Sequence, residues 1–149
     1  MDIVNVPNRR FVGLEVVAPF DELDKVIPAA WNELRTRRDE IGGKVNDVIS
    51  DVTLGDSMGA YHTLIAVEVA PGTEPPPGMV AFDVPPHRAL HRSKVAAADE
   101  IPAVYNEMLE WAAASGLVTD GLKIDDGYVA VAGRRRKRTP HDLHVRIAS

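Results

Sequence analysis

The sequence predicts an α+β fold in which a β-α-β-β module occurs twice and builds one antiparallel sheet, with two helices flanking a central groove. The main observation is an internal repeat. The segment IPAAWNEL at residues 27–34 returns as IPAVYNEM at residues 101–108, an offset of 74 residues. Residues 71–78 hold four prolines and two glycines and predict a connector between the halves. Two copies of one unit usually meet at a seam, which is a natural place for a ligand groove.

Short runs of apolar and β-branched residues predict three strands in each half. The run at residues 61–69 is apolar on both faces and is therefore expected at the centre of the sheet. One run in the second half is interrupted by two prolines, which cannot donate to a strand ladder. The predicted strands cover residues 11–18, 48–54, 61–69, 79–84 with 87–95, 128–132 and 143–147.

Each half also carries one helix. In the first, Pro28 is expected in the opening turn because proline has no N–H to donate, and Gly42–Gly43 marks the end. In the second, Asp99 is expected to cap the helix and Gly116 to stop it. The predicted buried stripes are Ile27, Trp31 and Leu34 in the first helix, and Ile101, Val104, Tyr105, Met108, Trp111 and Ala112 in the second.

Length and composition indicate one globular domain over residues 1–149, with pseudo-repeats at about 10–70 and 79–149 that share a core. The net charge of -5 argues against a nucleic-acid binder and favours cationic or neutral partners. The chain has no cysteine, which excludes disulfides and thiol chemistry and is typical of a cytoplasmic protein. No signal peptide and no apolar run of the ~20 residues that a membrane span needs is recognised.

The order and spacing of several segments resemble a GyrI-like effector-binding domain. This domain is the ligand-binding part of some AraC-type and MerR-type transcription regulators, and it also occurs as a free-standing protein. No single matching segment is very specific, but together they cover nearly the whole chain. The segments are residues 10–14, 27–34, Tyr61 with 67–69, 78–80, 84–86, 101–111 and 143–147.

The resemblance implies a helix from each module beside a central groove that takes bulky aromatic or cationic compounds. Some free-standing relatives hydrolyse strained electrophilic small molecules, and one branch modulates DNA gyrase by protein contact. The family often places an acidic residue in the strand represented here by residues 128–131. This sequence has no acid there, and Asp125 and Asp126 lie just before it. All segments are used by the domain, so no helix-turn-helix is expected.

Six side chains are candidates for the groove. Trp31 and Trp111 lie on the helix stripes, where core packing is the commoner role and a groove wall the functional one. Tyr105 is the repeat counterpart of Trp31. Glu68 interrupts an apolar strand, either as a salt-bridged structural residue or as a groove carboxylate suited to a cation or to acid–base work. The predicted ligand-binding residues are Trp31, Tyr61, Glu68, Tyr105, Trp111 and Tyr128.

Three functions remain open from the sequence. A small-molecule-binding protein needs only an aromatic groove. A hydrolase needs an acid–base residue beside it, for which Glu68 with Tyr61 or Tyr128 is the best available set. A protein-interaction module needs a surface patch, and the basic run at residues 134–138 is its one candidate, although a solvated loop is the commoner role. The five histidines lack metal-ligand spacing, so neither a metal nor a cofactor is expected.

Overall fold

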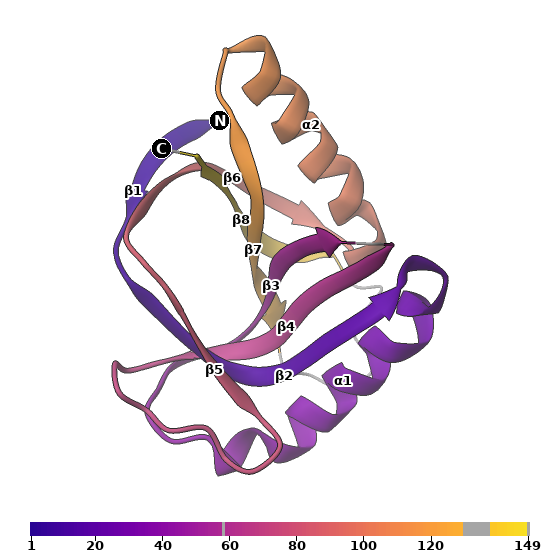
Figure 1. The fold of residues 1–149 in the computed structure, drawn as a ribbon, viewed down its shortest axis with the longest axis vertical. Helices are drawn as coiled ribbons and strands as arrows, with labels where there is room; N and C mark the ends of the chain where they lie inside the picture. Colours follow the sequence, from indigo (N-terminus) through magenta and orange to yellow (C-terminus); the bar gives the residue numbers. More distant parts are fainter. Residues whose placement is uncertain (58, 130–137, 149) are drawn as a thin grey trace.

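The computed structural model describes residues 1–57, 59–129 and 138–148. Eight antiparallel strands form one sheet that curls strongly, and the helices α1 (Leu23–Arg37) and α2 (Ile101–Ala114) lie beside it (Figure 1). The predicted α+β class and its duplicated module are confirmed. The strands are β1 (Asp2–Val6), β2 (Arg9–Pro19), β3 (Lys44–Ser57), β4 (Ala60–Val69), β5 (Val80–Val84), β6 (His87–Ala96), β7 (Thr119–Val129) and β8 (Thr139–Ile147).

The strand order β1-β6-β8-β7-β3-β4-β2-β5 is symmetric about its middle. The module β2-α1-β3-β4 forms one half and β6-α2-β7-β8 the other, and β3 pairs with β7 where they meet. The two leading strands are exchanged, because β1 pairs with β6 and β5 pairs with β2. The sequence patterns did not predict β1, whose ladder partner lies in the other half of the chain.

Both helices pack on the same face of the sheet. Trp31 and Leu34 of α1 pack with Ile65 and Val67 of β4, and α2 packs in a second cluster on β6 and β8. The opposite face carries a third apolar cluster that includes Phe11, Val52, Leu64 and Ile124. Among the described residues, no helix is long and apolar enough to cross a membrane.

The two helices start differently, and this corrects two expectations. Because α1 begins at Leu23, Pro28 lies inside the helix and not in its first turn, whereas Pro102 is the second residue of α2. The first residues of α1 and α2 are 78 residues apart but the helix repeat has an offset of 74, so α1 begins about one turn earlier relative to the repeat, although the helices are 15 and 14 residues long. Asp99 is not the cap: the Glu100 carboxylate accepts the Ala97 N–H at 3.0 Å.

Strand β7 is the largest difference from the sequence prediction. It begins at Thr119 and not at residue 128, and β8 begins at Thr139 and not at 143. Asp125 and Asp126 therefore lie within a strand and not before one. Glycine and aspartate disfavour strands locally, but β7 is paired on both sides, with β3 and with β8, and this pairing overrides the local preference. Residues 130–132 of the predicted strand lie outside the described part of the chain.

Candidate ligand-binding site

A cavity of about 520 Å³ lies between the first halves of α1 and α2, above the central strands of the sheet. Its volume is typical of a small-molecule pocket. The walls include one tryptophan and two tyrosines, Trp31 of α1, Tyr105 of α2 and Tyr61 of β4. The central strands supply a polar floor. The remaining lining residues are Phe20, Leu23, Asp24, Ile27, Asp51, Thr53, Ala98, Asp99, Ile101, Pro102, Asn106, Lys123 and Asp125.

Two aspartates lie side by side on this floor. Asp51 of β3 and Asp125 of β7 are direct cross-strand partners. They are 74 residues apart, the same offset that relates Trp31 to Tyr105. The two carboxylates and the two aromatic rings are thus equivalent pairs of the repeat, and the seam between the halves passes between the aspartates.

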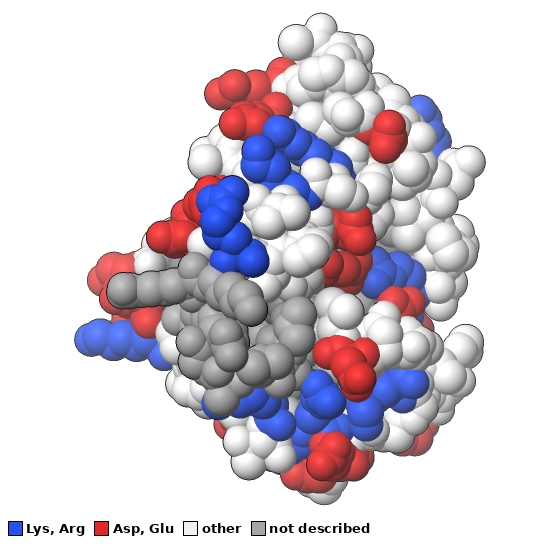
Figure 2. Space-filling model, turned by 180° about the vertical axis from the view of Figure 1, so that it is seen from behind, with Lys and Arg blue, Asp and Glu red and all other residues white. Residues whose placement is uncertain are grey.

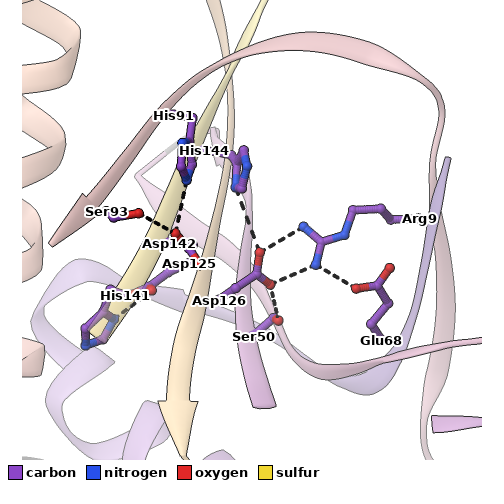
Figure 3. A network of polar contacts seen from close by, with 10 residues as sticks. All are labelled: Arg9, Ser50, Glu68, His91, Ser93, Asp125, Asp126, His141, Asp142 and His144. Carbon is purple, nitrogen blue, oxygen red and sulfur yellow. Dashed lines mark hydrogen bonds and ion pairs between the residues drawn. The ribbon is translucent and has the colours of Figure 1, made fainter. Parts of the chain in front are cut away.

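The equivalent aspartates have different partners. The Thr63 hydroxyl donates to the Asp51 carboxylate. At the corresponding place in the other half, His141 Nδ1 lies 2.7 Å from Asp125 Oδ1 (Figure 3). His141 and Asp125 are each about 2% exposed, whereas Asp51 keeps part of its surface open to the pocket. One carboxyl therefore has a neutral partner and the other a partner that can carry a positive charge.

Burial raises the pKa of Asp51 to about 6. The hydrogen bond from Thr63 opposes this rise because it favours the ionised form, and the charge of Asp125 adds to it. Asp51 is consequently largely ionised at neutral pH and largely protonated near pH 5. The pocket floor can thus change its charge within a mild pH range.

Two of the aromatic side chains in the walls contact neighbouring side chains. Lys123 Nζ lies 5.4 Å from the centroid of the Tyr105 ring, so one ring face already contacts an ammonium group. The Tyr61 hydroxyl is 2.7 Å from the Thr53 hydroxyl, and its ring centroid is 5.9 Å from that of Phe20. These contacts hold the Tyr61 ring at the pocket wall.

Three of the six predicted ligand-binding residues, Trp31, Tyr61 and Tyr105, come together in this pocket. Trp111 lies further along α2, outside the pocket lining, and is 39% exposed where a buried position was expected. The backbone of Tyr128 belongs to β7, but its side chain lies outside the described part of the structure.

Glu68 lies on the other face of the sheet from the pocket. Its carboxylate is 2.8 Å from the Arg9 guanidinium, which also binds Asp126 through two hydrogen bonds of 2.9 Å (Figure 3). Burial opposes the charge on Arg9, but the bonds to Asp126 and Glu68 outweigh it and raise the pKa of Arg9. This arrangement matches the structural role considered for Glu68.

The same face carries His144 and His91, whose ring centroids are 4.8 Å apart. Burial lowers the pKa of His144, and the nearby charge of Asp126 opposes this effect. His91 Nε2 and the Ser93 hydroxyl both bond to Asp142, at 3.0 and 2.6 Å (Figure 3). Within the described residues, no three His, Asp or Glu side chains are grouped as metal ligands would be.

Sequence reasoning missed the two acids of the pocket floor. Asp51 and Asp125 stand beside other polar residues, so neither interrupts an apolar pattern as Glu68 does. The available signal was the repeat itself, because its offset of 74 pairs one aspartate with the other.

Comparisons with known structures agree on the fold. The EcmrR C-terminal domain is 11% identical, with 99% of this chain and 96% of that one covered and a TM-score of 0.71. The structure of SAV2435 bound to tetraphenylphosphonium is 9% identical, with 99% and 93% covered and a TM-score of 0.70. A hydrolase from Listeria innocua is 9% identical, with 99% and 91% covered and a TM-score of 0.59. At these identities the likeness shows the fold alone.

No curated protein is significantly similar to this chain in sequence. The family model of the GyrI-like small molecule binding domain, however, matches residues 1–128. This match spans both helices, seven of the eight strands almost completely, and every residue that lines the pocket. The chain therefore belongs to the GyrI-like small-molecule-binding domain family.

Proposed function

We propose that this protein binds lipophilic aromatic cations in the pocket between α1 and α2. Trp31, Tyr61 and Tyr105 supply aromatic surface, and Asp51 with Asp125 supplies negative charge beneath it. The observation that carries the proposal is this pair of carboxylates side by side on the floor of an aromatic-walled cavity.

The charge of the pocket supports a cationic ligand. Four carboxyl groups line the cavity, from Asp24, Asp51, Asp99 and Asp125, against one ammonium group, from Lys123. In a cavity partly closed to water, this excess of negative charge attracts a cation more strongly than it would in bulk solvent. A ligand cation would also contact the ring faces of Trp31 and Tyr105.

A relative supports the ligand class. The structure of SAV2435, which shares the fold, contains tetraphenylphosphonium, a permanently charged aromatic cation. Such a compound matches the combination of rings and carboxylates in the pocket of this chain. We therefore take tetraphenylphosphonium as the probe.

The test is a titration at pH 8 followed by tryptophan fluorescence, with neutral triphenylphosphine oxide as the uncharged analogue. The cation should bind saturably and more tightly than the neutral compound. Asp51→Asn keeps the shape of the side chain but removes its charge. It should weaken binding of the cation about tenfold, or ~1.4 kcal/mol, with little effect on binding of the neutral analogue.

The matched control is Asp47→Asn, which makes the same chemical change near the start of β3, where the Asp47 side chain is 85% exposed. Binding by this control should equal that of the parent. Equal affinity of the parent for the cation and the neutral analogue, or no binding of either, would refute the proposed ligand class.

A second candidate, hydrolysis of electrophilic small molecules, is favoured by one observation. Asp51 and Asp125 lie side by side at the pocket, one with a pKa raised to about 6 and one bonded to His141. Two carboxyl groups in different environments can divide the roles of general acid and general base. Mass spectrometry of epoxides and other strained electrophiles incubated with the protein tests this candidate, and turnover abolished by Asp51→Asn would support it.

The protein-interaction module has no comparable support. Most of the basic run at residues 134–138 lies outside the described part of the chain, and Arg138 pairs with Glu100 at 2.5 Å. On the face shown in Figure 2, basic and acidic side chains are interspersed around the residues drawn in grey. A protein partner and the cytoplasmic location stay predictions.

A further inference from the structure

The two aspartates of the pocket floor influence each other's charge. Asp51 and Asp125 are adjacent across the β3–β7 ladder, and both contribute to the cavity surface. Two carboxylates held side by side repel each other when both are ionised, so one of them is favoured to keep a proton. The different partners decide which one, because Asp125 has His141 as its partner and Asp51 has the hydroxyl of Thr63.

We propose that binding of a lipophilic monocation at this floor is coupled to release of one proton from the Asp51 carboxyl. The inference rests on the proposed function and adds a proton as the second ligand of the same site. Proton and cation compete, since each removes the unfavourable charge of the paired carboxylates and both cannot do so at once.

The surroundings of Asp51 determine whether cation binding releases or takes up a proton. On balance burial and Asp125 outweigh the hydrogen bond from Thr63, and the pKa of Asp51 in the free protein is raised to about 6. A bound cation lowers it again because an opposite charge favours the ionised form. The titratable or charged groups that face Asp51 across the pocket or the sheet are Asp24, Tyr61, Asp99, Tyr105, Lys123, Asp125 and His141.

The affinity for a permanent cation should therefore rise with pH and then level off. If only the ionised site binds, the Kd for tetraphenylphosphonium falls about tenfold from pH 5 to pH 7 and hardly changes between pH 7 and pH 8. This probe has no titratable group, so the change must come from the protein. Neutral triphenylphosphine oxide should show no such dependence.

The number of protons released can be measured directly. Calorimetric titration with tetraphenylphosphonium in two buffers of different ionisation enthalpy should give about 0.7–0.9 proton released per cation near pH 5.3, and almost none at pH 8. Asp51→Asn should abolish the release near pH 5.3. Asp47→Asn should retain it, because that carboxylate is far more exposed and lies outside the pocket lining.

A second variant keeps the test decisive if Asp51→Asn does not fold. Thr63→Val removes the hydroxyl that favours ionised Asp51 while roughly preserving volume. The midpoint of the pH dependence should then move upward by about 0.5–1 pH unit. An unmoved midpoint would assign the proton to another group.

The outcomes separate the two proposals. No binding of tetraphenylphosphonium at any pH contradicts the proposed function itself. Binding with the same Kd from pH 5 to pH 8 and no proton release contradicts only the coupling. Release that persists in Asp51→Asn also overturns the coupling, because the proton then comes from a group other than Asp51.

Discussion

At the scale of single residues, the pocket shows how a duplicated site acquires different chemistry in its two halves. Asp51 and Asp125 occupy equivalent positions, but Thr63 and His141 differ in the charge they can carry. Trp31 and Tyr105 are likewise equivalent but chemically different, and Tyr105 has Lys123 over its ring. Each of these differences between the halves changes one side of the pocket. The two walls that a ligand contacts are therefore chemically different, although the backbone around them is pseudo-symmetric.

The candidate site residues found from the sequence were those that stand out in the pattern of their neighbouring residues. Trp31 and Tyr105 stand on clear helical stripes, and helical periodicity is enough to place them near the seam. Glu68 attracted attention as an acid in an apolar strand, but its partner Arg9 lies 59 residues away and on the same side of the sheet, opposite the pocket. Only the pairing of distant strands could show which face each acid occupies.

The first prediction concerns the two tryptophans. Trp111→Phe leaves Trp31 as the sole tryptophan, and tetraphenylphosphonium should still quench the fluorescence, because Trp31 lines the pocket. Trp31→Phe leaves only Trp111, which is 39% exposed and outside the lining, so quenching should largely disappear. Titrations of both variants at pH 8 check this. Strong quenching in Trp31→Phe would place a binding site at the outer part of α2.

The second prediction concerns Arg9, which bridges Asp126 and Glu68 with its side chain only 12% exposed. Arg9→Met leaves two carboxylates without their cation in a half-buried place, and should lower the free energy of unfolding by about 2–4 kcal/mol at pH 7. Urea denaturation measures this value. Ligand affinity should be unchanged because the pocket lies on the other face.

The control for Arg9 is Arg92→Met, which removes a pair with Glu107, whose side chain is 60% exposed. This variant should lower the free energy of unfolding by less than about 1 kcal/mol, as for other exposed ion pairs. A similar loss in both variants would mean that the Arg9 cluster adds little to the stability of the sheet.

At the scale of elements, the local patterns located both helices and most strands but not their limits. Strand β7 was placed too late because TDGLKIDD, residues 119–126, contains residues typical of turns. Its strand conformation depends on the ladders to β3 and β8, which no local window contains. Because the predicted start of β7 was too late, Asp125 was expected in a loop before the strand and was not considered as part of the pocket floor.

The third prediction follows from the earlier start of α1 relative to the repeat. Pro28 lies inside α1 and cannot donate to the carbonyl four residues earlier, at Asp24, whereas Pro102 occupies the start of α2, where the N–H has no helical acceptor. Pro28→Ala should therefore stabilise the protein by about 1–2 kcal/mol, after allowance for the more flexible unfolded chain. Pro102→Ala should be neutral or slightly destabilising, by less than about 1 kcal/mol.

Thermal unfolding of both proline variants distinguishes them. The Tm should rise in Pro28→Ala and stay level or fall in Pro102→Ala. A fall in both would indicate that Pro28 itself is needed for α1 to pack on the sheet.

At the scale of the whole molecule, charged groups that are poorly solvated, and therefore cost stability, line the ligand pocket. The apolar clusters cover both faces of the sheet, yet the floor between the helices holds Asp51, Asp125 and Lys123. Ionised Asp51 is poorly solvated, and a protein selected for stability alone would place a neutral side chain there. A stability cost at a binding site is the usual sign of a trade between stability and function.

The last prediction tests this trade through the pH dependence of stability. The pKa of Asp51 is raised to about 6 in the folded protein from its ordinary value of 3.8, so the folded state binds this proton more tightly than the unfolded state. The resulting stabilisation is complete below about pH 4 and is lost as the pH rises through 6. Asn at this position resembles the protonated carboxyl and can still accept the Thr63 hydroxyl. Asp51→Asn should therefore raise the free energy of unfolding at pH 8 by about 1–3 kcal/mol, and change it little at pH 4.

Urea denaturation of parent and variant at both pH values measures the difference, which isolates Asp51 from carboxylates such as Asp142, whose pKa is lowered by Ser93 and His91. The same variant should bind tetraphenylphosphonium more weakly at pH 8, so stability and affinity move in opposite directions. A variant that is less stable than the parent at pH 8 would show that ionised Asp51 supports the fold. The carboxylate would then be a structural group, and its position under the aromatic walls would need no ligand to explain it.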